Sequence, residues 1–262
     1  MPQTSPVVLL TGASRGLGAA AAREAARRGA HLVLNARRAG LLENVAAACR
    51  AEGVIVHTVP GDIGEEATAQ RMVAVAAEAF GRIDALIHNA GVLPPIAPLA
   101  RANLQAWEAN WRVNFFAAVA LLRHGLPLLR VSRGRVVLVS SGAAIHAYPT
   151  WGAYCSAKAA LNHLAAVLAA EEPDITALAF RPGIVDTDMQ ADIRTQGAGV
   201  MPPDLHAKFL AYRREGRLQP PAVVARPLIT LALHAPHTWS GRFVAYYDEE
   251  VQQLVAKTTP EA

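Results

Sequence analysis

Tyr154 and Lys158 are two residues whose types and spacing suit acid–base chemistry. They stand four residues apart at the start of an apolar pattern, Leu161, Leu164 and Leu168, that predicts a helix. Since positions i and i+4 share one helix face, we expect the Tyr154 hydroxyl and the Lys158 ammonium to point into the same space. A phenol titrates at about pH 10, and a fixed cation beside it should lower its pKa toward neutrality. The pair therefore predicts a general acid for a carbonyl oxygen, although this spacing also occurs on ordinary amphipathic helices.

Ser141 and Asn114 are two further polar residues that could assist such an acid. Ser141 lies at the hydroxyl-bearing end of a strand-like segment, 135–142, and 13 positions before Tyr154. Asn114 lies among apolar neighbours, where an unpaired amide would be costly. We expect Asn114 to bond to backbone at a helix irregularity or to hold a water that leads toward the active site, and both can be true.

A glycine-rich turn precedes these residues and predicts where a cofactor binds. A short apolar run, 7–10, suits a buried strand, and a helix pattern follows from 19 to 28. Between them Gly12, Gly16 and Gly18 allow a tight turn and let a pyrophosphate approach the helix N-terminus. Strand, glycine turn and helix in this order predict a dinucleotide site, since a plain strand-to-helix turn explains only one glycine.

The end of the next strand, 31–34, indicates which dinucleotide this site binds. An NAD site carries an acid here to bind the adenosine ribose, whereas this sequence has Ala36 followed by Arg37 and Arg38. Arg15 in the glycine turn could reach the same region. Guanidinium groups suit a phosphate dianion, so we expect NADP, although arginines at a solvated helix start are also common.

Further alternating strands and helices predict a parallel sheet covered on both faces. Strand 54–59 leads to Asp62, which could accept from the adenine amino group or cap the helix 65–80. Strand 83–87 ends at Asn89, which could pin neighbouring strand ends. A long helix is expected over 103–129, a strand over 175–180, a helix over 221–234 and a last strand over 242–246, which completes the chain. Residues 189–219 are expected to be irregular and, over about 188–219, to form a substrate lid.

Composition excludes several other classes of protein. The 262 residues are 52% hydrophobic, which suits one α/β domain spanning 1–262. Two cysteines and no metal-ligand spacing indicate neither a disulfide scaffold nor a metal site. The net charge of +4 comes from dispersed arginines, so we expect no nucleic-acid partner. The sequence has no uninterrupted run of about 18 apolar residues, so no membrane span is expected and the cytoplasm is the default compartment.

Together these motifs resemble the short-chain dehydrogenase/reductase family over essentially the whole chain. The resemblance implies one Rossmann-type doubly wound domain with a seven-stranded parallel sheet, and a homodimer or homotetramer. It implies that Tyr154 is the acid/base, that Ser141 polarises the substrate oxygen, that Lys158 also holds the nicotinamide ribose, and that Asn114 supports a water in the proton relay. The cofactor contacts it implies are Gly12, Ser14, Arg15, Gly16, Leu17, Gly18, Arg37, Arg38, Asp62, Ile63, Asn89, Ala90, Gly91, Tyr154, Lys158, Pro182, Gly183, Ile184 and Thr187.

Within the family, segments 181–189 and 240–248 are similar to sepiapterin reductases and benzil reductases. Sepiapterin reductases carry an acid in the second segment where this chain has Ala245, which argues against a pterin substrate. NADPH-dependent reduction of a ketone or diketone is therefore expected. The alternatives are a 3-oxoacyl-thioester reductase, an alcohol dehydrogenase working oxidatively, and a non-catalytic NADP-binding sensor. His146, Tyr148 and Trp151 are candidates for the substrate pocket because they lie between Ser141 and Tyr154.

Overall fold

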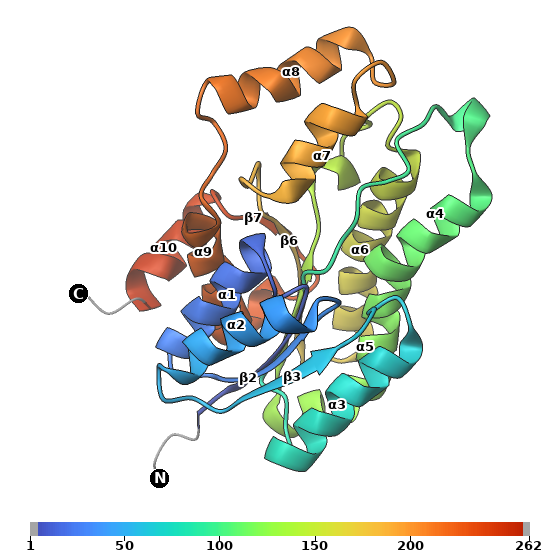
Figure 1. Ribbon diagram of the computed structural model, residues 1–262. Helices are drawn as coiled ribbons and strands as arrows, with labels where there is room; N and C mark the ends of the chain where they lie inside the picture. The colour runs from blue at the N-terminus through green and yellow to red at the C-terminus, as the bar shows by residue number, and fades with distance from the viewer. Residues whose placement is uncertain (1–4, 259–262) are drawn as a thin grey trace.

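Seven parallel strands form one sheet in the computed structural model, which describes residues 5–258 (Figure 1). The strand order is β3-β2-β1-β4-β5-β6-β7. The strands are β1 (Val7–Thr11), β2 (His31–Ala36), β3 (Val56–Pro60), β4 (Ala85–His88), β5 (Arg135–Val139), β6 (Thr176–Arg181) and β7 (Phe243–Ala245). The predicted fold class, a doubly wound α/β sheet of Rossmann type, is confirmed.

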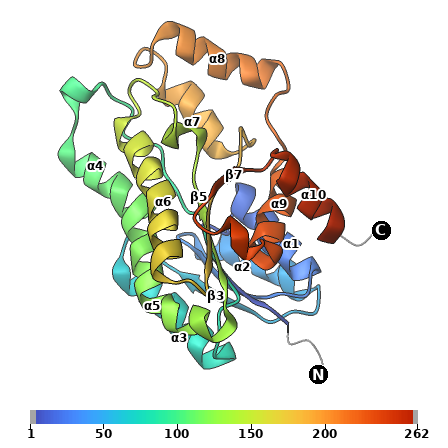
Figure 2. The ribbon, with the colours of Figure 1, turned by 180° about the vertical axis from the view of Figure 1, so that it is seen from behind.

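Helices cover both faces of this sheet (Figures 1 and 2). One face carries α1 (Gly16–Arg27), α2 (Ala39–Arg50), α9 (Pro221–His234) and α10 (Glu249–Thr258). The other carries α3 (Glu66–Phe80), α5 (Ala117–Ser132) and α6 (Gly152–Glu171). Val8 and Leu10 face the first layer and Leu9 the second, and all three are at most 1% exposed. Burial on both sides explains why the strand is a continuous apolar run without alternation.

The chain reverses its direction across the sheet between β1 and β4, which are neighbours in the order. Connections from these two strands lead to opposite faces, and a crevice opens beyond their carboxyl ends. The glycine turn follows β1, the 89–91 segment follows β4, and Ser140-Ser141 follows β5. The fold thus collects the predicted site residues along one edge of the sheet.

Residues 189–219, predicted to be irregular, contain two helices, so that prediction is wrong. They are α7 (Asp188–Gln196) and α8 (Pro203–Arg214), which lie over the carboxyl edge of the sheet (Figure 1). The prolines and glycines here mark helix ends: Pro203 occupies the first turn of α8, and Gly197 follows the last residue of α7. The chain also continues past β7 into α10, a helix that the sequence analysis missed.

The predicted long helix is continuous from Leu104 to Ser132 and contains one irregular stretch. Its parts are α4 (Leu104–Trp111), a π-helical turn (Arg112–Phe116) and α5. Its most apolar 18-residue window has a mean hydropathy of 1.3 and is 33% buried. By length and composition alone, this helix is long and apolar enough to cross a membrane. The core helix of a soluble protein can have the same length and composition. Here α5 packs against α3 in the hydrophobic core on their side of the sheet.

Candidate active site

A cavity of about 590 Å³ opens at the carboxyl edge of the sheet and contains almost all the predicted site residues. Every residue predicted to contact the cofactor lines it, from Gly12 in the first turn to Thr187 before α7, and so does Ser141. Asn114 is fully buried and does not line the cavity. The walls come from segments that follow six strands, β1 to β6, so the fold itself brings these side chains together.

The glycine turn forms a cradle that side chains would fill. A Cβ added to Gly18 would lie 2.1 Å from the carbonyl oxygen of Gly12 and 2.6 Å from Asn89 Nδ2. Gly12 and Gly16 have φ values of 67° and 53°, a region that L side chains rarely adopt. No side chain caps the N-terminus of α1, so its first N–H groups are open to an anion. These features fit the pyrophosphate of a dinucleotide.

Arg37 and Arg38 lie exposed at one end of the cavity, directly after β2. Ala36 belongs to β2 and is buried, so no acidic side chain stands at that strand end. Asp62 accepts the N–H of Gly64 at 2.9 Å, and Glu65, not Asp62, precedes the first turn of α3. Of the two roles considered for Asp62, the helix cap is therefore excluded.

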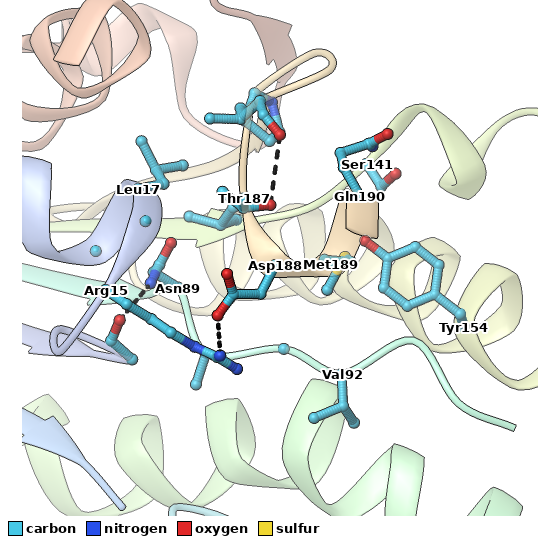
Figure 3. A pocket seen from close by; sticks show the side chains of 18 of the residues that line it. Arg15, Leu17, Asn89, Val92, Ser141, Tyr154, Thr187, Asp188, Met189 and Gln190 are labelled. Atoms are coloured by element: carbon cyan, nitrogen blue, oxygen red, sulfur yellow. Dashed lines mark hydrogen bonds and ion pairs between the residues drawn. The ribbon is translucent and has the colours of Figure 1, made fainter. Parts of the chain in front are cut away.

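Arg15 makes an ion pair that the sequence did not suggest. Its guanidinium contacts the carboxylate of Asp188, the first residue of α7 (Figure 3). Beside this pair, a Cβ on Gly16 would lie 2.9 Å from the methyl group of Thr187. The glycine turn therefore touches the start of α7 across the cavity.

Hydrogen bonds tie the end of β1 to the end of β4. Thr11 Oγ1 accepts the N–H groups of Asn89 and Ala90 at 3.1 and 3.0 Å, and Asn89 Nδ2 donates to the carbonyl of Thr11 at 3.0 Å. The hydrogen of the Thr11 hydroxyl is then left for His88 Nδ1, 3.2 Å away. His88 Nε2 in turn carries the ring hydrogen and donates to the carbonyl of Val113 at 3.1 Å. The predicted pinning by Asn89 is confirmed, whereas the part played by His88 was missed.

Burial keeps His88 neutral. Desolvation, with a smaller contribution from the Lys158 charge, lowers the pKa of His88 to about 3. An imidazole without a proton on Nδ1 is the form that this hydrogen-bond pattern requires.

Asn114 lies within the π-helical turn and is hydrogen-bonded to the backbone. Of the two roles expected for it, this one is confirmed. Its Oδ1 accepts the N–H of Val92 at 3.2 Å, and its Nδ2 donates to the carbonyl of Val92 at 2.8 Å. Asn110, one turn earlier, also bonds to Asn114, and two buried amides at this spacing were a signal the sequence analysis did not use. A Cβ on Gly91 would lie 3.0 Å from Asn114 Oδ1 and 3.4 Å from Lys158 Nζ, so Gly91 leaves free space between the amide and the ammonium.

Tyr154 and Ser141 meet on the wall of the cavity (Figure 3). Ser141 lies near enough to influence the pKa of Tyr154, and its Oγ accepts the N–H of Ala143 at 3.1 Å. Lys158 stands one turn after Tyr154 on α6, with Nζ 5.6 Å from the centroid of the Tyr154 ring. Its ammonium donates to the carbonyl of Val139 at 2.8 Å and is not hydrogen-bonded to the phenol.

The expected lowering of the Tyr154 pKa by Lys158 is not what the structure shows. Burial raises the pKa of Tyr154 to about 12, and the neighbouring Ser141 hydroxyl opposes this only in part. Burial also lowers the pKa of Lys158 to about 7. Both groups are withdrawn from water, and this effect exceeds that of the cation beside the ring. The Tyr154 hydroxyl therefore keeps its proton at neutral pH.

Aromatic side chains form the opposite end of the cavity. Tyr148 stacks on Trp151 with ring centroids 4.9 Å apart, and Phe209 of α8 lies 5.2 Å from Trp151. The predictions for Tyr148 and Trp151 are confirmed in that both line the cavity, but His146 is exposed at the loop tip and does not. Gln190 and Arg181 also line it and were not predicted, since their positions depend on how α7 and β6 end.

Comparison with known proteins matches this architecture. The model of the family described as short chain dehydrogenase matches residues 6–198. Benzil reductase ((S)-benzoin forming) of Saccharomyces cerevisiae is 34% identical over 257 residues, covering 94% of this chain and 97% of that protein. Sepiapterin reductase of Bos taurus is 34% identical over 256 residues, covering 92% and 94%. The crystal structure of the KRED1-Pglu enzyme is 38% identical, covers 92% of this chain and 100% of that chain, and has a TM-score of 0.87.

Proposed function

This chain belongs to the short-chain dehydrogenase family, and from that premise we propose that it reduces a ketone or diketone to the hydroxy compound with NADPH. The observation that carries the proposal is the Tyr154 hydroxyl, which burial keeps protonated, beside Ser141 on the wall of a cavity whose other end is a glycine cradle. A proton donor and a dinucleotide site in one cavity suit carbonyl reduction.

The residues of this chain fit a nicotinamide dinucleotide along the whole cavity. The glycine turn and the open N-terminus of α1 would hold the pyrophosphate, and Lys158 and Thr187 lie where they could contact the nicotinamide end. NADPH, when bound, supplies the hydride that adds to the carbonyl carbon. The protein has to orient the substrate and supply a proton.

Ser141 and Tyr154 divide that work. The Ser141 hydroxyl donates to the substrate oxygen and orients it, and Tyr154 Oη releases its proton to the same oxygen as negative charge develops there. A pKa of about 12 keeps the phenol protonated until an alkoxide, the stronger base, forms beside it. The substrate C=O thereby becomes C–OH, and the phenolate takes up a replacement proton from solvent by way of the space at Gly91 between Lys158 and Asn114.

Selection of NADP rests on Arg37 and Arg38. Both side chains are exposed at the adenosine end, and neither has an ion-pair partner among residues 5–258. The buried Ala36 leaves no carboxylate to bind a free ribose hydroxyl or to repel a phosphate. Two free guanidinium groups favour the 2′-phosphate.

The aromatic wall favours a bulky ketone. Rings of Tyr148, Trp151 and Phe209 offer a large apolar surface next to Tyr154. A relative that reduces benzil, by its name, supports a diketone substrate for this chain. We also expect a homodimer or homotetramer in the cytoplasm.

The test is oxidation of NADPH by the purified protein with a panel of aryl ketones and 1,2-diketones. We expect turnover with several of these, and a kcat/KM for NADPH well above that for NADH. Replacing Arg37 and Arg38 by Gln should remove the preference without abolishing turnover with NADH. Absence of turnover with every ketone would contradict the reductase assignment, and a preference for NADH would contradict the choice of cofactor.

A further inference from the structure

Arg181, the last residue of β6, places a cationic group in the cavity wall next to Ser141. A Cβ added to Gly142 would lie 3.0 Å from one terminal nitrogen of the Arg181 guanidinium and 3.1 Å from its Cζ and Nε. The guanidinium therefore lies flat against Gly142, the residue that directly follows Ser141. The charge therefore lies beside the hydroxyl that would bind a carbonyl oxygen.

No acidic side chain neutralises Arg181 within residues 5–258. Its guanidinium has no carboxylate within 4.0 Å and makes no side-chain hydrogen bond, and its one specific contact is the ring of Tyr247, 5.6 Å from Cζ to centroid. Ala245 stands opposite Arg181 in the register of β6 and β7 and offers no charge. Asp248, on the same loop as Tyr247, uses its carboxylate to accept the N–H of Ala245.

The acids of the cavity wall are occupied elsewhere. Asp186 pairs with Arg213 at 3.3 Å and Asp188 pairs with Arg15, whereas Asp62 lies at the adenosine end. The end of the cavity near Ser141 therefore carries an excess of positive charge. A half-buried guanidinium with free donors matches the two oxygens of a carboxylate.

We propose that Arg181 binds a carboxylate of the substrate, so that the ketone reduced here is a keto acid with a bulky apolar group on the Tyr148–Trp151–Phe209 wall. This rests on the proposed ketone reduction and goes further, because it assigns a charge to the substrate. Ser141 holds the ketone oxygen, the apolar group lies against the rings, and the carboxylate meets the N–H edge of the Arg181 guanidinium, whose face lies on Gly142.

Comparing each keto acid with its methyl ester tests this, because the ester removes the charge and changes the shape of the molecule little. The substrates are 3-benzoylpropionate and 4-benzoylbutyrate and the methyl ester of each, with saturating NADPH. At least one acid should have a kcat/KM about tenfold above that of its ester, since a charge-assisted bidentate bond is lost in the ester. Arg181→Gln should lower kcat/KM for the acid to that of the ester and leave the ester unchanged, and Arg181→Lys should restore part of the preference. Arg226→Gln, which removes an exposed arginine on α9 that does not line the cavity, is the control and should change neither.

A binding measurement separates failure of this inference from failure of the reductase assignment. Calorimetric titration of 4-phenylbutyrate and of 4-phenylbutyramide into the NADP-loaded protein needs no turnover. The acid should bind about tenfold more tightly than the amide, and the difference should vanish in Arg181→Gln. Equal binding of acid and amide, or equal loss in both with Arg181→Gln, overturns the carboxylate site whether or not ketones are reduced. Turnover of the esters without any preference for the acids also overturns it while leaving ketone reduction intact.

Discussion

The two ends of the cavity are built differently. At the cofactor end the buried polar groups are paired: Thr11, His88 and Asn89 bond to one another or to backbone between β1 and β4. At the substrate end, Gln190 Oε1, Trp151 Nε1 and the adjoining Thr150 Oγ1 are buried without a hydrogen-bond partner among residues 5–258. Thr150, a β-branched residue, also has a φ of 75°.

The difference indicates what each end is for. A dinucleotide is bound by fixed backbone, and a closed hydrogen-bond network keeps that backbone in one arrangement. The stacked rings at the other end offer an apolar surface to a substrate, and the buried polar atoms around them are not tied into a network. The cofactor end should therefore respond to small changes of shape, and the substrate end to changes of surface chemistry.

Lys158 stands between the two ends, and its removal should have the largest effect. Lys158→Ala deletes the donor to Val139 and the cation next to Tyr154 together. We expect kcat/KM to fall by at least the roughly 10²–10⁴-fold that general acid catalysis contributes, with weaker NADPH binding as well. Lys257→Ala, at an exposed position on α10, should behave as the wild type. Unchanged steady-state kinetics in Lys158→Ala from pH 6 to pH 9 would refute the role given to it.

Adding a single methyl group should disrupt the cofactor end of the cavity. In Gly18→Ala the new Cβ meets the backbone oxygen of Gly12, so the turn must shift, at a cost of about 1–3 kcal/mol in the free energy of unfolding. NADPH should bind much more weakly by fluorescence titration. Gly40→Ala is the matched control: this glycine is in α2, and apart from its chain neighbours and its own helix backbone no atom of residues 5–258 lies within 4 Å of the added Cβ. The change should raise stability by up to about 1 kcal/mol. Equal NADPH affinity in the two variants would mean that the turn is not a cradle.

The neutral state of His88 should make the protein sensitive to acid. Its pKa is about 3 in the folded chain and about 6.5 when unfolded, so below pH 6.5 the unfolded chain takes up a proton that the folded chain does not. Stability is then lost by about 1.4 kcal/mol per pH unit as pH falls from 6.5 toward 3. Urea unfolding of wild type and His88→Asn at pH 7.5, 6.0 and 5.0 measures this, and the variant should have the shallower slope. Parallel curves would show that His88 is protonated in the folded state.

Replacing Phe209 should give the smallest effect, and this effect should be confined to the substrate end of the cavity. Phe209→Ala removes the ring that packs on Trp151 from α8. KM for an aryl ketone should rise about fivefold through lost aromatic contact, with KM for NADPH unchanged. An equal rise in both KM values would show that the two ends do not act separately.

Sequence patterns predicted the cofactor end well because its residues follow their strands directly. Gly12, Asn89 and Ser141 each lie within three residues of a strand end, so finding the strand finds the residue. The substrate end depends on how α7 and α8 dock, over residues far in sequence from Tyr148 and Trp151. Residues 189–219 were expected to be irregular although Gly197 and Pro203 mark helix ends there, and nothing local revealed where Gln190 or Arg181 would point. The pKa of Tyr154 was also missed, because the extent of burial is not visible in spacing.

The most direct test of the account compares Tyr154→Phe with the wild type in two measurements on the same preparation. The substitution removes one oxygen from a ring that stays packed against Trp151. We expect the Kd for NADPH to remain within about twofold, while turnover of a ketone falls about 10²–10⁴-fold because the proton donor is gone. Turnover close to that of the wild type, with NADPH bound normally, would show that the proton comes from elsewhere and that Tyr154 is not the acid of this site.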